Sequence, residues 1–63
     1  MIGTRFSVLL VDDDSDTHNL FQMVMDHHNH ELVIVTDAEA ALSYLKANTP
    51  DIIVMDIFLP GIL

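Results

Sequence analysis

Carboxylate side chains follow two separate apolar segments and are the groups best suited to chemistry in this sequence. Asp12 and Asp13 come directly after residues 8–11, and Asp56 comes directly after residues 52–55. If both segments are parallel strands of one sheet, these carboxyl groups meet at the edge where α/β proteins bind ligands. Two carboxylates about 5 Å apart at an effective dielectric near 20 repel each other by roughly 3 kcal/mol. This cost favours a bound cation.

The ligand chemistry of such a cluster indicates which cation it takes. Carboxylate oxygens suit Mg²⁺ or Mn²⁺ better than Zn²⁺, which prefers nitrogen and sulfur. A divalent cation would also screen an incoming phosphoryl group, so that one carboxylate can act as the nucleophile and form an acyl phosphate. The sequence therefore predicts a divalent-metal site at Asp12, Asp13 and Asp56 that can support phosphoryl chemistry.

Three apolar runs alternate with two helical segments along the chain. The runs at residues 8–11, 32–35 and 52–55 are rich in Val, Ile and Leu, which is typical of strands covered on both faces. Helical periodicity lies between them, at about residues 15–28 and 37–47. This order implies right-handed crossovers and a parallel sheet. With the first strand central, we expect a three-stranded α/β sheet of order 2-1-3, whose acidic residues converge where the strand order reverses.

Local signals predict the ends and faces of the helices. Thr36 and Glu39 have capping-box spacing, which predicts that Thr36 caps the second helix. The first helix is expected to end near His28, with Asn29 in the left-handed conformation. The second helix has a narrow apolar stripe, formed by Ala38, Ala41, Leu42 and Leu45. The first helix spreads its apolar side chains over about 200°, which is wider than one sheet face requires; they are Leu20, Phe21, Met23, Val24 and Met25.

Composition excludes several classes of protein. The chain of 63 residues forms at most one small domain, spanning residues 1–63, and it has no cysteine for disulfides. Its net charge of −8 argues against nucleic acid and against anionic membrane surfaces. The longest apolar run is four residues, too short for a transmembrane helix or a signal-peptide core. We therefore expect a cytoplasmic location.

Three stretches of the sequence, VLLVDDD, TDAEAALSYL and PDIIVMDIFLPG, resemble the receiver domains of two-component response regulators in their order and separation. The resemblance spans nearly the whole chain and implies half of a flavodoxin-like fold. By position, Asp56 matches the phosphorylated aspartate, and Asp12 and Asp13 match the acidic pair. Asp13 would bind the metal directly and Asp12 through water, and the backbone carbonyl of Phe58 matches the remaining protein ligand. The resemblance implies Mg²⁺ as cofactor, a histidine kinase as partner, and a signalling module that is not an enzyme.

The resemblance also implies what lies beyond residue 63. The family's turn after the phosphoacceptor is present at Pro60 and Gly61, but its later Ser or Thr and its Lys, which contact the phosphoryl group, would follow Leu63. We therefore expect a receiver truncated after the third strand, with metal binding retained and switching impaired. An apolar third-strand edge without a partner recruits another chain. Together with the wide face of the first helix, it predicts a homodimer.

Two other functions fit parts of the sequence. The main alternative is a self-associating structural or interaction fragment without phosphotransfer, and a test of phosphorylation at Asp56 separates it from the signalling module. A phosphatase of the haloacid-dehalogenase type would use Asp12 as nucleophile and Asp14 as acid/base. That motif normally continues with Thr or Val where this chain has Asp16, and its fold needs a far longer chain.

Two further metal-site patterns are incomplete. Asp12, Asp14 and Asp16 have the spacing of a calcium loop, but the required glycine and the glutamate at the twelfth position are absent. His27 and His28 occupy adjacent helical positions, which diverge by about 100°, so they are not expected to share one metal ion.

Overall fold

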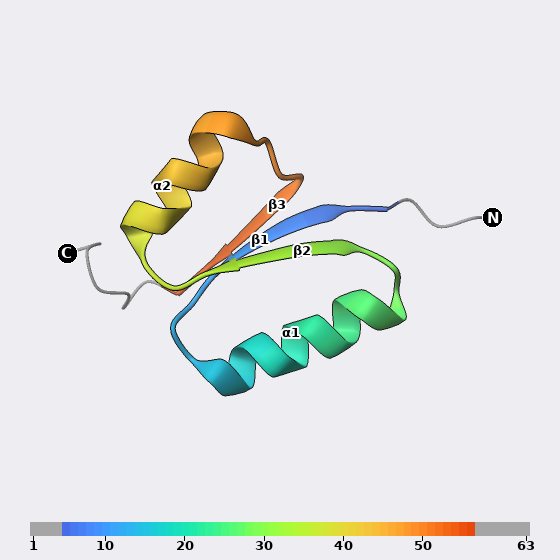
Figure 1. The fold of residues 1–63 in the computed structure, drawn as a ribbon. Coiled ribbons are helices and arrows are strands. Elements are labelled where there is room, and N and C mark those ends of the chain that lie inside the picture. Colours follow the sequence, from blue (N-terminus) through green and yellow to red (C-terminus); the bar gives the residue numbers. More distant parts are fainter. Residues whose placement is uncertain (1–4, 57–63) are drawn as a thin grey trace.

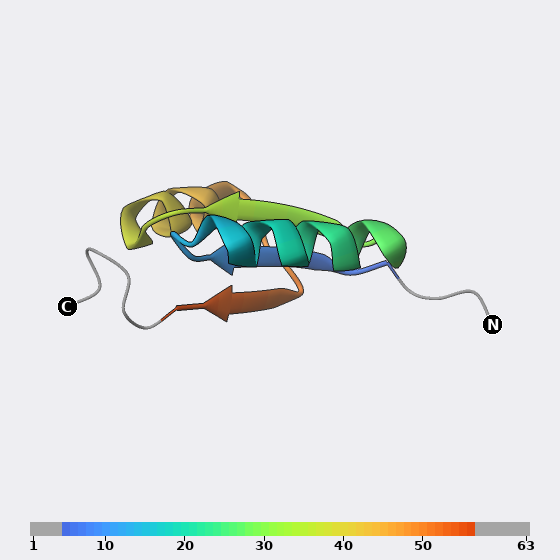
Figure 2. The ribbon, with the colours of Figure 1, turned by 90° about the horizontal axis from the view of Figure 1, so that it is seen from below.

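The structure is a computed structural model that describes residues 5–56 (Figure 1). Its elements are β1 (Ser7–Val11), α1 (Ser15–His27), β2 (Glu31–Val35), α2 (Ala38–Ala47) and β3 (Ile52–Met55). The three strands are parallel and lie in the order β2-β1-β3. The helices lie on opposite faces of the sheet, as Figures 1 and 2 show from two directions. The predicted α/β class, parallel sheet and strand order are confirmed.

The core is built around β1, the central strand. The side chains of Val8, Leu9, Leu10 and Val11 are at most 6% exposed, because successive residues of a strand point to opposite faces and a helix covers each face. On the α2 face, Leu9 and Val11 form a buried cluster, and the residues packed with them are Ala41, Val33, Val35, Tyr44 and Leu45. β1 therefore supplies most of the fully buried apolar surface in the described part of the chain.

β3 is covered much less than β1. Ile52, Ile53 and Met55 are each 45–47% exposed. Helix α1 contacts β2, and α2 contacts β1 and β2, so the two helices, on their opposite faces, both lie mainly over the half of the sheet formed by β2 and β1. The prediction that all three strands are covered on both faces is thus confirmed for β1 and wrong for β3.

The ends of α1 follow the sequence signals closely. Asp14 is the N-cap, and its side chain accepts a hydrogen bond from the backbone N–H of Thr17. The helix ends at His27, one residue before the predicted position. Asn29 has φ of 59°, so its predicted left-handed conformation is confirmed. This residue turns the chain from α1 into β2.

The N-cap of α2 is Asp37 rather than the predicted Thr36. The Asp37 carboxylate accepts a hydrogen bond of 2.7 Å from the backbone N–H of Ala40. Because the helix starts one residue later than predicted, Glu39 does not occupy the capping-box position relative to the cap. A carboxylate is also favoured over a hydroxyl by the positive end of the helix dipole.

The buried face of α2 also differs from the prediction. Ala41 is buried and Tyr44 and Leu45 pack beside it, at the spacing i, i+3 and i+4. Leu42, which we placed on the buried stripe, is 64% exposed. The small Ala41 side chain lets α2 sit close to β1, and the helix is rotated so that Tyr44 replaces Leu42 in the contact.

Side chains fasten the start of β1 to both neighbouring strands. The backbone N–H of Phe6 donates to Nδ1 of His30 at 3.0 Å. The backbone N–H of Ser7 donates to the Asp51 carboxylate at 2.8 Å, and the N–H of Asp51 donates back to the Ser7 carbonyl at 2.8 Å. These bonds close the sheet at the end opposite to the acidic residues.

Among the described residues, no helix is long and apolar enough to cross a membrane.

The capping of α2 gives a test of the fold. Asp37→Ala should lower the free energy of unfolding by about 1 kcal/mol, because the Ala40 N–H loses its acceptor at the helix start. Thr36→Ala, one residue earlier, should have a smaller effect. Urea unfolding followed by circular dichroism measures both, and an equal or larger loss for Thr36→Ala would show that Thr36 is the cap.

Candidate metal centre

The register of the sheet sets Asp12 beside Asp56. Val11 pairs with Met55, so the next residues of the two strands, Asp12 and Asp56, lie side by side. The N–H of Asp56 donates to the Val11 carbonyl at 2.9 Å, and the N–H of Asp12 donates to the Val35 carbonyl at 3.1 Å. Both aspartates therefore extend the backbone ladder, and neighbouring strands are about 4.8 Å apart.

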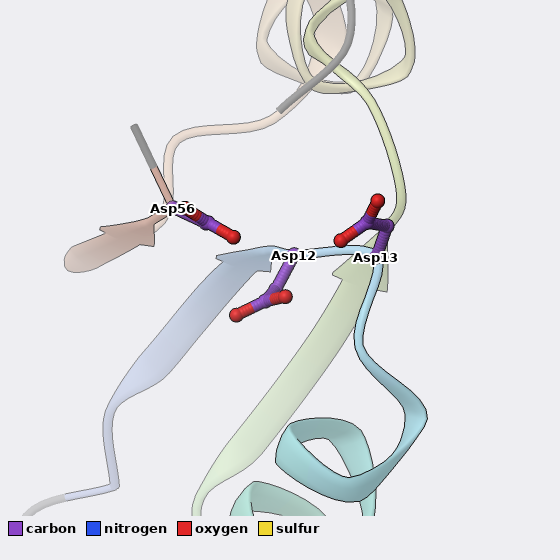
Figure 3. A group of neighbouring side chains, drawn as sticks. All are labelled: Asp12, Asp13 and Asp56. Carbon is purple, nitrogen blue, oxygen red and sulfur yellow. The ribbon is translucent and has the colours of Figure 1, made fainter. Parts of the chain in front are cut away.

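The structure brings together the three carboxyl groups selected from the sequence. One oxygen each of Asp12, Asp13 and Asp56 lies within 4.8 Å of the others. Figure 3 shows the Asp13 and Asp56 carboxyl groups directed toward one another across the end of β1. Asp12 and Asp56 are partly buried, and Asp13 is exposed. Phe58, whose carbonyl was the fourth predicted ligand, lies outside the described residues.

Hydrogen bonds hold the acidic turn against the start of α1. The Asp12 carboxylate accepts a bond of 2.9 Å from the N–H of Asp14. The Asp14 carboxylate accepts bonds from the hydroxyl of Thr17 at 2.7 Å and from its N–H at 3.3 Å. The Thr17 hydroxyl bond is the main cause that lowers the pKa of the Asp14 carboxyl below its ordinary value. Asp14 is therefore a helix cap, and the candidate metal site consists of Asp12, Asp13 and Asp56.

His18 is a residue of this region that the sequence reasoning missed. It lies in the second turn of α1, and its Nε2 is hydrogen-bonded to the backbone carbonyl oxygen of Asp12. The available signal was its position, one helical turn after the N-cap Asp14, from which a side chain points back toward the preceding loop.

The donor set and its spacing fit a hard divalent cation. All three side chains offer carboxylate oxygens, and like charges this close repel each other, with the repulsion weakened by solvent at the exposed Asp13. Two oxygens bound directly to one Mg²⁺ are at most about 4.2 Å apart, since each Mg–O distance is about 2.1 Å. A cluster that spans up to 4.8 Å suits a site in which one carboxylate binds through water.

The histidines near the end of α1 do not form a comparable cluster. The rings of His27 and His28 are perpendicular, with centroids 5.0 Å apart, and Nδ1 of His30 accepts the N–H of Phe6. Within residues 5–56, the acidic group is the one set of three or more His, Asp or Glu side chains whose ligand atoms converge.

Comparisons with known proteins place the chain in a family. A model of the response regulator receiver domain matches residues 8–63. The transcriptional regulatory protein AfsQ1 of Streptomyces coelicolor is 32% identical over 56 residues, which are 89% of this chain and 25% of that protein. The transcriptional regulatory protein TrcR of Mycobacterium tuberculosis is 32% identical over 60 residues, 95% of this chain and 23% of that protein. No solved structure gives a significant match.

A third relative extends the same pattern. The alkaline phosphatase synthesis transcriptional regulatory protein PhoP of Bacillus subtilis is 32% identical over 53 residues, 84% of this chain and 22% of that protein. The chain thus spans about a quarter of the length of these relatives. A parallel α/β sheet with carboxylates where its strand order reverses is the arrangement of a ligand-binding α/β module. The chain belongs to the response regulator receiver domain family of two-component systems, as the sequence motifs indicated.

Repulsion within the acidic cluster leads to a prediction for the cation-free protein. Asp13→Asn should raise the free energy of unfolding by about 1 kcal/mol, because an exposed like charge is removed from beside Asp12 and Asp56. Asp16→Asn is the matched control. Asp16 lies in the first turn of α1, where its charge favours the helix dipole, so its neutralisation should cost about 0.5 kcal/mol. Thermal unfolding in chelator measures both, and a destabilised Asp13→Asn protein would contradict repulsion at the site.

Proposed function

We propose that the chain is a phosphoacceptor module in which Asp12, Asp13 and Asp56 bind Mg²⁺, or Mn²⁺ in its place, and Asp56 receives the phosphoryl group. The supporting observation is the convergence of three carboxyl groups within 4.8 Å at two strand ends. Receiver domains generally bind Mg²⁺ through acidic residues, and this chain belongs to that family. The Phe58 carbonyl is proposed as the remaining protein ligand.

The proposed reaction is a transfer of a phosphoryl group to a carboxylate. An oxygen of Asp56 attacks the phosphorus of a phosphohistidine, and a bond forms between that oxygen and phosphorus. The phosphorus–nitrogen bond breaks, its electron pair stays on the imidazole nitrogen, and the product is an acyl phosphate. Asp12 and Asp13 hold the cation beside Asp56, and a bound cation screens the charge of the phosphoryl oxygens.

Receiver domains typically interact with histidine kinases, and we propose such a kinase as the donor for this chain. In this scheme the module is a substrate of the kinase and not itself an enzyme. We further propose a cytoplasmic location and no nucleic-acid binding by residues 1–63, whose net charge is −8. For a polypeptide of residues 1–63 alone, we propose metal binding with impaired switching, because the family's later Ser or Thr and Lys are not among these residues.

Phosphorylation at Asp56 can be tested directly. Incubation with Mg²⁺ and acetyl phosphate should add the mass of one phosphoryl group, and Asp56→Asn should abolish this gain. Glu39→Gln, which removes an exposed acid from α2, is the control and should react like wild type. Intact-mass spectrometry measures the gain, and equilibrium binding of the fluoroberyllate mimic measures recognition independently of rate.

A folded protein that gains no mass and binds no fluoroberyllate would reject the phosphoacceptor proposal. A gain that persists in Asp56→Asn would show that another residue is the acceptor.

We also propose that the 63-residue polypeptide forms a homodimer through β3 and α1. Three large apolar side chains of β3 are 45–47% exposed: Ile52, Ile53 and Met55. On α1, Leu20, Met23 and Val24 are 55%, 64% and 40% exposed. A depression of about 230 Å³ on this helix is lined by Leu20, Phe21, Val24 and Met25. Exposed apolar surface of this kind favours association.

A twofold axis perpendicular to the sheet would pair two β3 strands antiparallel. With Ile53 on the axis, Ile52 would face the partner's Val54. No aspartate would then lie directly opposite another aspartate, which avoids the cost of facing like charges.

Substitution at the proposed axis tests the dimer. Ile53→Lys should give a monomer, because two ammonium groups would meet at the axis. Leu42→Lys places the same charge on α2, at a side chain that is 64% exposed and outside the proposed surface, and should leave the dimer intact. Sedimentation velocity at micromolar concentration distinguishes the species. A compact wild-type monomer, or a dimer that survives Ile53→Lys, would overturn the proposal.

A further inference from the structure

We propose that His18 is a positioning residue for the acidic pair: its imidazole holds the Asp12 carbonyl and thereby fixes the direction in which Asp13 reaches the site. The observation is the hydrogen bond between Nε2 of His18 and the backbone carbonyl oxygen of Asp12. The inference deepens the proposed metal-binding function and rests on it for one of its two measurements.

The chemistry of the contact assigns the roles of its two atoms. A carbonyl oxygen only accepts hydrogen bonds, so Nε2 of His18 must carry the hydrogen and donate it. The neutral ring is therefore in the tautomer protonated at Nε2, and Nδ1 is its acceptor nitrogen. Nothing in this contact requires a positive charge on the imidazole.

The His18 imidazole donates to the Asp12 carbonyl at a point where β2 has ended and its backbone supplies no donor. The N–H of Asp12 still donates to Val35, which is the last residue of β2. In a longer parallel pair, a later residue of β2 would donate to the Asp12 carbonyl. The chain instead turns there into α2, whose N-cap is Asp37. The His18 side chain reaches the Asp12 carbonyl from the opposite helix, α1.

The direction of this carbonyl controls the neighbouring ligand. The carbonyl of Asp12 and the amide of Asp13 belong to one planar peptide group. When His18 fixes the oxygen, it also fixes the Asp13 nitrogen and limits the positions open to the Asp13 Cα. Asp13 is exposed, so packing alone constrains its carboxyl group weakly. Partners that orient a metal ligand commonly determine its affinity.

Helix capping does not explain the contact. Asp14 is the N-cap of α1, and the backbone N–H of His18 already donates to the Asp14 carbonyl at 3.1 Å. Thr17 satisfies the Asp14 carboxylate. The His18 side chain therefore acts on the loop before the helix, and its removal leaves the cap and the backbone bonds of α1 in place.

Two substitutions separate hydrogen bonding from packing. His18→Gln keeps a donor nitrogen the same number of bonds from Cα as Nε2 of histidine, and His18→Leu keeps bulk without a donor. Titration with Mg²⁺ alone should give a Kd at least about 10-fold weaker for His18→Leu. His18→Gln should bind within about 3-fold of wild type. Unfolding midpoints of all three proteins report any general loss of stability.

A second measurement needs no metal. In chelator at mildly alkaline pH, where imidazole is ordinarily neutral, nitrogen-15 NMR of the ring should show the hydrogen of His18 on Nε2. The amide signal of Asp13 should shift in His18→Leu and return toward its wild-type position in His18→Gln.

The outcomes distinguish this inference from the proposed function. A wild-type protein that binds no Mg²⁺ rejects the metal site, and the ring tautomer and the Asp13 signal then decide the positioning role alone. The role of His18 is overturned if the ring carries its hydrogen on Nδ1. It is also overturned if His18→Leu binds Mg²⁺ as tightly as wild type, or if both variants lose the same affinity and stability.

Discussion

The parallel pairing of β1 with β3 is the constraint on which the acidic site depends. Asp12 and Asp56 are far apart in sequence, and they become neighbours because Val11 pairs with Met55 one residue earlier. A shift of that register would separate them and would also move the apolar residues of β3 to the other face. The buried side chains of β1 stabilise the sheet against both the chain entropy of this long-range contact and the repulsion between carboxylates.

The surrounding structure constrains Asp12 more strongly than Asp56. Asp12 follows the central strand, and its backbone and carboxyl group accept bonds from His18 and Asp14. Asp56 follows β3, which the helices cover poorly. A cation that bound both would stabilise the folded state by an amount that rises with the logarithm of its concentration above the Kd, and in this arrangement it would join the less covered strand to the core. Metal binding and the docking of β3 would thus be thermodynamically linked.

The features that the sequence predicts well are those that depend on local pattern. Continuous apolar runs mark the three strands, and the aspartates directly after two of them follow each strand to the same sheet edge. The residue type and position of Asn29 predict its left-handed conformation. The receiver motifs also indicate the family, and the match over residues 8–63 confirms it.

The features that it misses depend on how elements sit against each other. Thr36 and Asp37 are both good caps, and the path from β2 into α2 decides between them. The sequence pattern puts Leu42 on the apolar stripe of α2, but a small rotation of the helix exposes Leu42 and packs Tyr44 against the core instead. The contact of His18 with Asp12 requires the packed orientation of α1. The cap of α2, its buried face and the His18 contact cannot be predicted from the propensities of single residues.

The geometry of β3 has a consequence for amide hydrogen exchange. The N–H of Asp56 points to β1, where it donates to the Val11 carbonyl, so the alternation along a strand directs the N–H groups of Ile53 and Met55 to the outer edge. Exchange at these two amides depends on what lies along that edge, whereas exchange at the amides of β1 depends on opening of the core. Hydrogen exchange in β3 therefore reports two separate properties. The amides that face β1 report the stability of the sheet, and the amides that face the outer edge report whether another strand is bound there.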